Sequence, residues 1–387
     1  MAETILITGA RAPVALDMAR DFKQAGYQVF LADCNSAYMT KWSNVAHKIL
    51  AYSSPVYQPE QFRRDIEGLI DRLQPKLIIP TCEEVFHLAH PDLEGCLKGK
   101  LFAPPLTVLN QLHNKETFNN VCSELNISAP ETHIIDNRYD LQTYQGSSKE
   151  WVFKPCYSRF GTQILIQPSV DQLKMVQPSE QNPWIAQKFI SGQECSFYAV
   201  LRNGKLISLA VYQSAWRLKG GASYVFTPAD LNAEKQAKII AEKLAQNLNL
   251  TGQLSCDLII DHDGIAWPIE CNPRATSGLH LLTGNGDLSR AIAYHAEYKV
   301  APGASQKYML PMMLSYGLIK AIKQKKYKDW LSTLKSGSDV ISSKNDRLPV
   351  LGSLLDTLIF AKHAFKHNLS LSQATTYDIE WNGETGS

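Results

Sequence analysis

The sequence lacks an apolar run long enough to cross a membrane. Hydrophobic residues make up 44% of its 387 residues, but no run reaches the ~18 residues that a spanning helix needs. The first ten residues, MAETILITGA, lack the basic segment of a secretory signal and turn polar within a few residues. We therefore expect no transmembrane segment and a cytoplasmic location.

An excess of charge of one sign is also missing. Lysine and arginine number 39 against 37 aspartate and glutamate residues, which gives a formal net charge of +2. This balance gives no electrostatic reason to expect nucleic acid as a ligand. The eight cysteines are scattered and form no C-x-x-C pair, which argues against a zinc cluster or a disulfide framework. We expect them to be small buried side chains in a reducing compartment.

Glycines are missing where a dinucleotide-binding turn needs them. Residues 3–8 predict a strand, and a helical pattern ending at Gly26 and a second strand at 27–32 follow it. Residues 1–105 therefore predict an open, Rossmann-like α/β domain. The turn between strand and helix reads GARAPV, which keeps only the first glycine of G-x-G-x-x-G. A site for NAD or FAD is therefore not expected.

The rest of the chain changes pattern twice. Residues 106–190 combine a helix with short strand candidates, and residues 191–304 are mostly strands around a long helix at 232–247. Strands with helices on one face are typical of the α+β class. Residues 305–387 carry helical patterns at about 312–335 and 350–367. They are predicted to form a helical C-terminal extension.

Six lysines gather in this extension, at positions 320, 323, 325, 326, 328 and 335, against the single acidic residue Asp329. Trp330 and Leu331 are interleaved with them. One interpretation is a helix that contacts a membrane surface or an acidic partner. The other is a solvated helical face packed on the rest of the molecule.

The strongest chemical signal is a predicted hairpin. Residues 252–260 and 265–271 predict two strands joined by the turn DHDG. A turn of this length places Asp257 nearly opposite Glu270, and Asn272 shares the face of Glu270 because side chains alternate along a strand. Glu270 lies in an apolar run, where a carboxylate needs a partner. The three side chains predict a site for Mg²⁺ or Mn²⁺, which phosphate oxygens and water would complete.

The segment PIECNPR, residues 268–274, resembles the E-x-N-x-R metal strand of the ATP-grasp superfamily. That superfamily includes biotin carboxylase, the large subunit of carbamoyl-phosphate synthase and D-alanine–D-alanine ligase. Three more segments follow its order: WVFKP (151–155) resembles its strand lysine, residues 156–161 its phosphate-covering loop, and IAQKFISGQECS (185–196) its adenine linker with a ribose-binding glutamate. The resemblance covers about residues 1–300.

The resemblance implies a division of the chain and a set of site residues. The expected parts are a pre-ATP-grasp domain (1–105), a lid subdomain (106–190), a catalytic subdomain (191–304) and the extension (305–387). The implied ATP-binding residues are Lys115, Lys154, Ser158, Gly161, Gln187, Lys188, Ile190 and Glu194, and the implied metal ligands are Asp257, Glu270 and Asn272. Lysines suit this role because they supply compact positive charge to phosphates.

The resemblance further implies that Arg274 stabilises the transferring phosphoryl group. Relatives carry a second arginine where this chain has Ser255, and Arg217 or Lys219 are candidates to replace it. Glu83 and Glu84 follow a strand of the first domain, where open sheets bind ligands, although carboxylates also gather at helix N-termini. His280 follows the metal strand. It is either a substrate contact or a structural histidine.

These residues and the resemblance together imply an activity. ATP would phosphorylate a small-molecule carboxylate to an acyl phosphate, and an amine would displace phosphate to form an amide with release of ADP and phosphate. The alternatives are a carboxylating or carbamoylating enzyme that uses bicarbonate, and a nucleotide-binding protein without turnover. A homodimer is a possible assembly.

Overall fold

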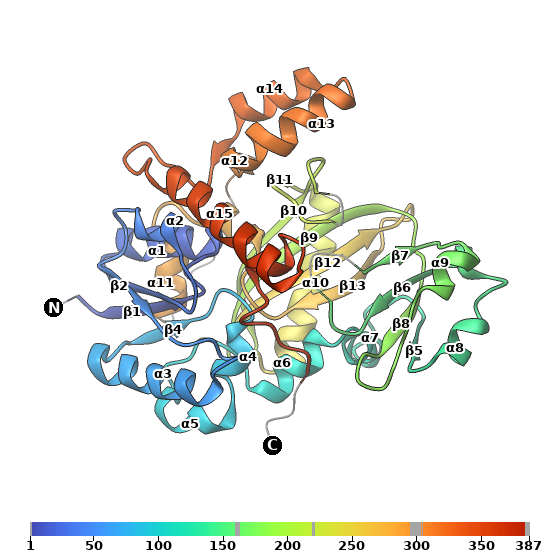
Figure 1. Cartoon of the computed structure of the whole chain (residues 1–387), viewed down its shortest axis with the longest axis horizontal. Coiled ribbons are helices and arrows are strands. Elements are labelled where there is room, and N and C mark those ends of the chain that lie inside the picture. Colours follow the sequence, from blue (N-terminus) through green and yellow to red (C-terminus); the bar gives the residue numbers. More distant parts are fainter. Residues whose placement is uncertain (1, 159–162, 219–220, 295–302, 304, 384–387) are drawn as a thin grey trace.

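A computed structural model describes residues 2–158, 163–218, 221–294, 303 and 305–383. Three sheets organise it, and Figure 1 shows them side by side with the helices of the C-terminal extension in front and above. Mixed α/β and α+β architecture, as the sequence predicted, is confirmed. Among the described residues, no helix combines the length and apolar character needed to cross a membrane.

The first sheet is parallel and lies in the N-terminal part. It contains β1 (Thr4–Thr8), β2 (Gln28–Asp33), β3 (Lys48–Ala51) and β4 (Leu77–Ile79) in the order β3-β2-β1-β4. Successive side chains of β1 point to opposite faces, so Ile5 and Ile7 pack with α1 (Pro13–Gln24), whereas Leu6 packs with α3 (Pro59–Leu73). Helices therefore cover both faces, and the predicted Rossmann-like domain is confirmed.

Short helices follow two of the strands: α2 (Tyr38–Lys41) comes after β2, and α4 (Glu84–Leu88) comes after β4. The next helix, α5 (Pro91–Leu97), packs with α3. The carboxyl ends of β1, β2 and β4 are the places where an open α/β sheet presents its ligand-binding edge.

The second sheet contains four antiparallel strands. We call this sheet and its helices the lid, after the subdomain expected from the sequence. Its strands are β5 (Thr132–Ile135), β8 (Trp184–Lys188), β6 (Trp151–Pro155) and β7 (Leu165–Ile166), in that order. The helices α8 (Arg138–Gln142) and α9 (Val170–Lys174) accompany it. Its core is built from the inward residues of alternating strands, among them Ile135, Phe153 and Trp184. This small independent core lets the lid hold its shape beside the larger sheet.

The third sheet is the centre of the molecule. Its order is β13 (Ala266–Asn272), β12 (Gly252–Ile260), β9 (Gln193–Arg202), β10 (Lys205–Gln213), β11 (Val225–Pro228), β14 (Lys307–Tyr308) and β15 (Ser338–Asp339). Neighbouring strands are antiparallel except for β14 and β15. The last two strands belong to the C-terminal extension, so the extension is joined to the central sheet through backbone hydrogen bonds.

Different helices cover the two faces of the central sheet. On one face α10 (Leu231–Asn247) packs with α6 (Leu106–His113) and α7 (Lys115–Glu124) in a single apolar cluster. On the other face a short 3-10 helix (Ser277–Leu281) and α11 (Asp287–Ala293) pack with α1 of the first domain. The first domain is therefore docked on the central sheet through a continuous core. Within the predicted 106–190 segment, α6 and α7 pack on the central sheet, whereas the strands, α8 and α9 form the lid.

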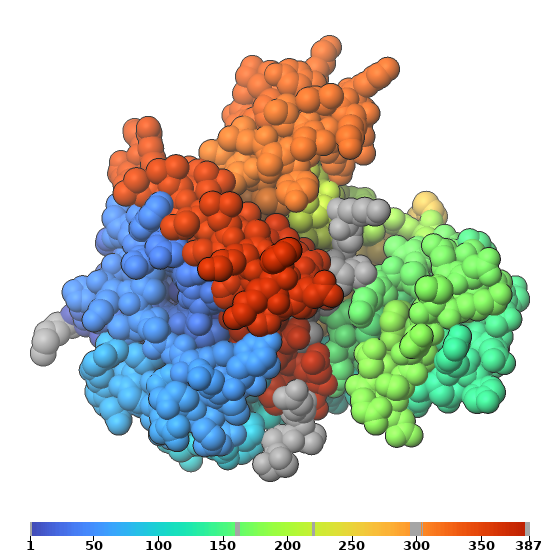
Figure 2. Space-filling model, in the orientation of Figure 1, coloured from blue at the N-terminus to red at the C-terminus, as the bar shows by residue number. Residues whose placement is uncertain are grey.

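The C-terminal extension has two helical parts, as predicted. A π-helical turn (Met313–Gly317) links α12 (Leu310–Met312) to α13 (Leu318–Lys323), and α14 (Tyr327–Ser336) returns beside α13. These helices project from the body (Figures 1 and 2). The longer α15 (Pro349–His367) lies across α2, where Asp356 accepts hydrogen bonds from the backbone of Tyr38 and Met39.

After a 3-10 turn (Gln373–Thr375), the chain returns to the first domain as a segment that we call the C-terminal strap, residues 376–383. Asp378, Ile379 and Trp381 of the strap are buried. Asp378 pairs with Arg11 in the loop after β1, and the Trp381 ring stacks on Phe86 with 5.9 Å between ring centroids. The strap therefore closes over the carboxyl edge of the first sheet.

Candidate functional site

The hairpin predicted from the sequence is present as β12 and β13. Asp257 pairs directly with Glu270, and Ser255 pairs with Asn272. A register shift follows Asp257, where Leu258 pairs with Pro268, so the ladder is bulged next to the two carboxylates. Because alternate residues share a face, Asp257, Glu270 and Asn272 lie on one side of the hairpin. The predicted alignment of the two carboxylates is confirmed.

Two buried lysines supply positive charge next to Glu270. Lys115 begins α7, and its Nζ lies 3.5 Å from Glu270 Oε1 with a fully buried side chain. Within the described residues, this ammonium has no hydrogen-bond partner. Lys154, on the central lid strand β6, donates from Nζ to the Ile269 carbonyl at 2.8 Å. The lysines come from outside the hairpin, so the site forms only when α7, the lid and the central sheet meet.

This arrangement sets the protonation of the site. Burial acts to raise the pKa of Glu270, but Lys115 and Lys154 outweigh it and hold that pKa below its usual value. Burial lowers the pKa of Lys154 to about 8. Burial, and then the charge of Glu270, raise the pKa of Asp257. The pKa values of the two carboxylates are thus shifted in opposite directions, and a cation bound between them would favour the ionised form of both.

The donor set fits a hard divalent cation. Two carboxylates and an amide present only oxygen ligands of the kind that Mg²⁺ takes. Ser196 on β9 faces Asp257 across the ladder and donates from Oγ to Asp257 Oδ1 at 2.6 Å, which orients that carboxylate. Ser196 was not among the residues predicted from the sequence. It could have been identified because it lies two residues after Glu194 on a predicted strand, so that the two side chains share one face.

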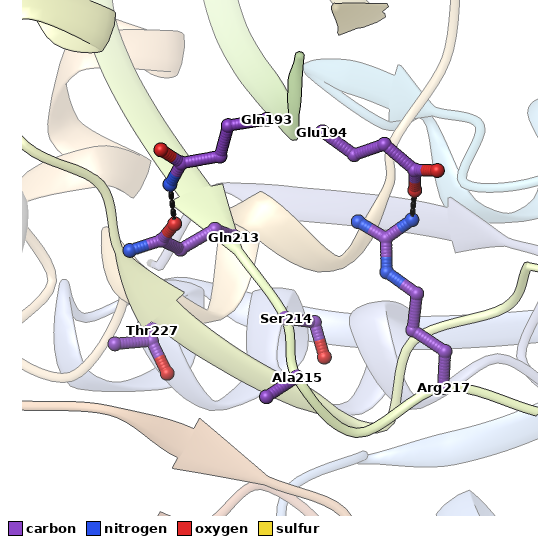
Figure 3. A pocket seen from close by; sticks show the side chains of 7 residues that line it. All are labelled: Gln193, Glu194, Gln213, Ser214, Ala215, Arg217 and Thr227. Carbon is purple, nitrogen blue, oxygen red and sulfur yellow. Dashed lines mark hydrogen bonds and ion pairs between the residues drawn. The ribbon is translucent and has the colours of Figure 1, made fainter. Parts of the chain in front are cut away.

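A shallow cavity of about 530 Å³ opens at the start of β9. Figure 3 shows its lining, which consists of Gln193, Glu194, Gln213, Ser214, Ala215, Arg217 and Thr227. Glu194 and Arg217 form an ion pair there, and Gln193 bonds to Gln213. Glu194 and Arg217 were predicted separately, and the structure brings them together. The lining does not include Asp257 or Glu270, so the cavity marks one end of the site and the carboxylate pair the other.

The adenine-linker residues lie where the lid strand β8 leads towards β9. Gln187 is buried, and its side chain donates to Thr132 Oγ1 at 3.1 Å, while Lys188 Nζ pairs with Glu150 at 2.6 Å. Both side chains are thus engaged within the lid. The backbone N–H groups of Lys188 and Phe189 donate to the carbonyls of Glu131 and Glu150, each at 2.8 Å. Ile190 is half-buried just beyond β8, and Ser158 is buried after β6. Gly161 and Lys219 lie outside the described residues.

Arg274 follows β13 and meets the first domain. Its Nη2 lies 3.5 Å from Oε1 of the buried Glu83. The strap reaches the same carboxylate, because the Trp381 backbone N–H donates to Glu83 Oε2 at 3.2 Å. Glu83 therefore joins the central sheet, the first domain and the strap at one point. Glu83, predicted as a substrate contact, thus lies next to Arg274, predicted as a catalytic residue.

Two candidate substrate residues have structural roles instead. Glu84 accepts hydrogen bonds from Thr8 Oγ1 at 2.7 Å and from the Thr81 backbone at 3.0 Å, so it ties β1 to the end of β4. His280 is fully buried, bonds to Asp17 at 2.7 Å and stacks on Phe226. It holds α1 against the central sheet. For Glu84 and His280, burial and these partners favour the structural alternative that the sequence left open.

Comparison with known proteins agrees with this geometry. Residues 112–278 match the family of ATP-grasp domains. Among solved structures, the chain is similar to L-amino acid ligase from Bacillus licheniformis, with a TM-score of 0.56, 16% identity and coverage of 73% of this chain and 71% of that one. It is similar to phosphoribosylamine–glycine ligase from Thermotoga maritima, with a TM-score of 0.61, 17% identity and coverage of 78% of each chain.

A third similar structure is the biotin carboxylase domain of 2-oxoglutarate carboxylase from Hydrogenobacter thermophilus, a dimer in complex with MgADP, ADP and bicarbonate. Its TM-score is 0.60 at 16% identity, over 79% of this chain and 73% of that one. The three matches share the fold of this chain and extend well beyond the matched 112–278 segment. They show that most of this chain adopts a known fold.

Proposed function

Since the chain carries an ATP-grasp domain, we propose that it is an ATP-dependent ligase that joins a small-molecule carboxylate to an amine. The observation that carries this proposal is the meeting of Asp257 and Glu270 with two buried lysines, one of which has no hydrogen-bond partner among the described residues. Lys115 has the charge of Glu270 nearby, but a buried ammonium without a hydrogen-bond acceptor is costly. The phosphates of ATP would supply the missing acceptors.

Each part of the site has a proposed task in holding ATP. Lys115 and Lys154 bind the phosphates as point charges. Main-chain groups of Gln187, Lys188 and Ile190 contact the adenine, and Ser158 and Gly161 belong to the loop that covers the phosphates. Glu194 accepts hydrogen bonds from the ribose, which requires Arg217 to release it and turn to the phosphates. Binding of ATP would thus exchange the Glu194–Arg217 pair for contacts with the nucleotide.

Asp257, Glu270 and Asn272 would hold Mg²⁺, which neutralises phosphate charge when it is bound. Arg274, whose guanidinium lies beside Glu83, stabilises the charge that develops on the transferring phosphoryl group. In the first step a carboxylate oxygen attacks the γ-phosphorus and ADP leaves. In the second step an amine nitrogen attacks the acyl carbon, phosphate leaves and the nitrogen releases its proton.

The similar structures support the reaction class. They include an L-amino acid ligase, a phosphoribosylamine–glycine ligase and a biotin carboxylase domain in complex with MgADP, ADP and bicarbonate. At 16–17% identity these proteins share only the fold with this chain, so the carboxylate and the amine are left open. The proposal names the class of both substrates and the order of the two steps.

Trapping with hydroxylamine tests the proposal. The purified chain is incubated with Mg·ATP, hydroxylamine and pools of carboxylic acids, and hydroxamates are detected by their coloured ferric complex. Hydroxylamine takes the place of the amine and captures an acyl phosphate, so a positive pool establishes carboxylate activation and its subdivision identifies the acid. ATP binding is measured separately by calorimetry. Binding of ATP without hydroxamate or ADP formation from any pool would contradict the proposal.

A further inference from the structure

The projecting helices of the extension form a surface that the proposed reaction does not use. We call residues 318–336, which comprise α13, α14 and the turn between them, the basic hairpin. Its inner side is fixed to the molecule: Ala321 and Trp330 are buried with Trp216 and Tyr224, and Trp330 Nε1 donates to the Met313 carbonyl at 2.8 Å. The hairpin therefore has one packed side and one outer side.

The outer side exposes large apolar side chains. Ile319 and Ile322 are 52% and 65% exposed, and the nearby Tyr316 and Tyr327 are 51% and 53% exposed. Among the described residues, 22 large apolar side chains are exposed, and 11 of them lie beyond residue 305. Three of these 11 belong to the basic hairpin and Tyr316 lies just before it, so the hairpin carries a local group of exposed apolar side chains.

Positive charge surrounds these apolar side chains. Lys323, Lys325, Lys326 and Lys328 are exposed on the hairpin, and Asp329 is the acidic residue among them. Residues 305–387 hold 11 basic and 7 acidic residues, whereas the remainder of the chain holds 28 and 30. The extension thus carries a net charge of +4 on a molecule whose other parts sum to −2. The net charge of the whole chain is therefore close to zero although the positive charge is concentrated in the extension.

The combination of positive charge and exposed apolar side chains indicates which kind of partner fits the hairpin. A second copy of this chain would place one cluster of lysines against another, and like charges repel. Nucleic acid would match the lysines but gives exposed isoleucines no apolar environment. An anionic lipid surface offers both, because headgroups attract lysines while apolar side chains enter the boundary with the acyl chains. The hairpin also projects from the body (Figure 2), so it can reach a flat surface first.

We propose that the basic hairpin binds the surface of membranes that contain anionic lipids, with Ile319 and Ile322 inserted among the headgroups and the four exposed lysines paired with them. Lysine stems can lie along apolar surface while their ammonium groups remain in water. This binding does not depend on the ATP site. It would hold the enzyme at a membrane without a spanning helix.

Flotation of the full chain with vesicles tests this proposal. The chain should bind vesicles of phosphatidylcholine with phosphatidylserine and not vesicles of phosphatidylcholine alone, and added salt should weaken the binding. The double variant Lys325→Gln, Lys326→Gln should lower the partition coefficient on the order of 25-fold, at roughly fivefold per lysine. The double variant Ile319→Gln, Ile322→Gln should lower it by roughly tenfold or more.

Matched substitutions elsewhere serve as controls. Lys235→Gln with Lys238→Gln removes two exposed lysines from α10, and Leu231→Gln removes a leucine that is 84% exposed. Neither should change vesicle binding, and thermal unfolding should be similar for all variants. Equal binding to neutral and anionic vesicles, or none to either, would overturn the proposal. So would a dimer in sedimentation velocity that is lost in the isoleucine variant while vesicle binding is absent.

Discussion

At the scale of single residues, the charges of the site converge on Glu270. It faces Asp257 across the hairpin and lies beside Lys115. Replacing Glu270 with glutamine removes a proposed metal ligand and leaves two buried lysines without their nearest anion. We expect Glu270→Gln to lower ATP-dependent turnover by roughly 10²–10³-fold or more, because charge stabilisation of this kind is concentrated in a few groups. Initial rates of ADP release with the acid identified by trapping measure this effect.

The matched control is Glu234→Gln, which changes an exposed carboxylate in the first turn of α10. Its turnover should remain close to that of the natural chain. Circular dichroism of both variants separates lost activity from lost structure, since removal of one member of a buried ion pair also reduces stability. Unimpaired turnover in a folded Glu270→Gln chain would contradict the metal assignment.

His87 is a second residue with a measurable consequence. Burial lowers its pKa to about 4, and its Nε2 lies 3.2 Å from the Glu380 carbonyl of the strap. The unfolded chain binds a proton to this ring near pH 6.5, whereas the folded chain does not until about pH 4. The contribution of His87 to the free energy of unfolding is therefore fully present above pH ~6.5 and is lost as the pH falls towards about 4.

The size of this loss is on the order of 3 kcal/mol, at about 1.4 kcal/mol for each unit of pKa difference. Urea unfolding of the natural chain and of His87→Gln at several pH values between ~4 and ~7 isolates it from the titration of other groups. The difference in unfolding free energy between the two chains should shrink as the pH falls. A constant difference would show that His87 titrates normally in the folded chain.

The sequence predicted some of these residues and not others for a physical reason. Asp257 and Glu270 are joined by a tight turn, so strand alternation alone fixed their alignment. The partner of His280 is Asp17, which is 263 residues away, and no local pattern reports such a contact. Glu84 was placed correctly at the carboxyl edge of the first sheet. Only the structure could show that Thr8 and Thr81 donate hydrogen bonds to its carboxylate.

At the scale of elements, α15 depends on one close backbone approach. A β-carbon on Gly352 would lie 2.4 Å from the Tyr38 carbonyl oxygen of α2. We expect Gly352→Ala to lower the free energy of unfolding by roughly 1–3 kcal/mol, because the two helices must separate. Gly68→Ala is the control: it also lies within a helix, α3, and its added β-carbon would meet nothing within 4 Å.

Gly68→Ala should instead stabilise the chain by roughly 0.5–1 kcal/mol, since alanine favours a helix more than glycine does. Opposite signs for two chemically identical substitutions would confirm the contact between α15 and α2. Equal effects in chemical denaturation would contradict it. The comparison requires no knowledge of the substrate.

Sequence periodicity was sufficient to predict the long helices but did not predict the shortest strands. The helix predicted at 232–247 is α10, and the patterns at about 312–335 and 350–367 correspond to α12–α14 and α15. The strands β14 and β15 contain two residues each, which is too short for any alternation to be visible. Their pairing with the central sheet depends on tertiary contacts, and it makes part of the extension continuous with that sheet.

At the scale of the whole molecule, the C-terminal strap joins parts that are far apart in the sequence. Its contacts reach Arg11 and Phe86 in the first domain, Glu83 beside Arg274, and Asn110 on α6, which accepts from Trp381 Nε1 at 2.7 Å. The strap has no periodic pattern and forms no strand, so no helix or strand was predicted for it from the sequence. Its order comes from burial against residues that other segments place in position.

Trp381 is the anchor of the strap, and its truncation tests whether the strap holds the first domain to the central sheet. We expect Trp381→Ala to lower the free energy of unfolding by roughly 3–5 kcal/mol, since a large buried ring and its hydrogen bond to Asn110 are both lost. Trp42→Ala, at a partly exposed tryptophan of the first domain, should cost much less. Limited proteolysis of Trp381→Ala should cut within 376–387 before any other site, because a released strap is exposed chain. Early cleavage elsewhere, with the strap still protected, would mean that the other strap contacts hold it without Trp381.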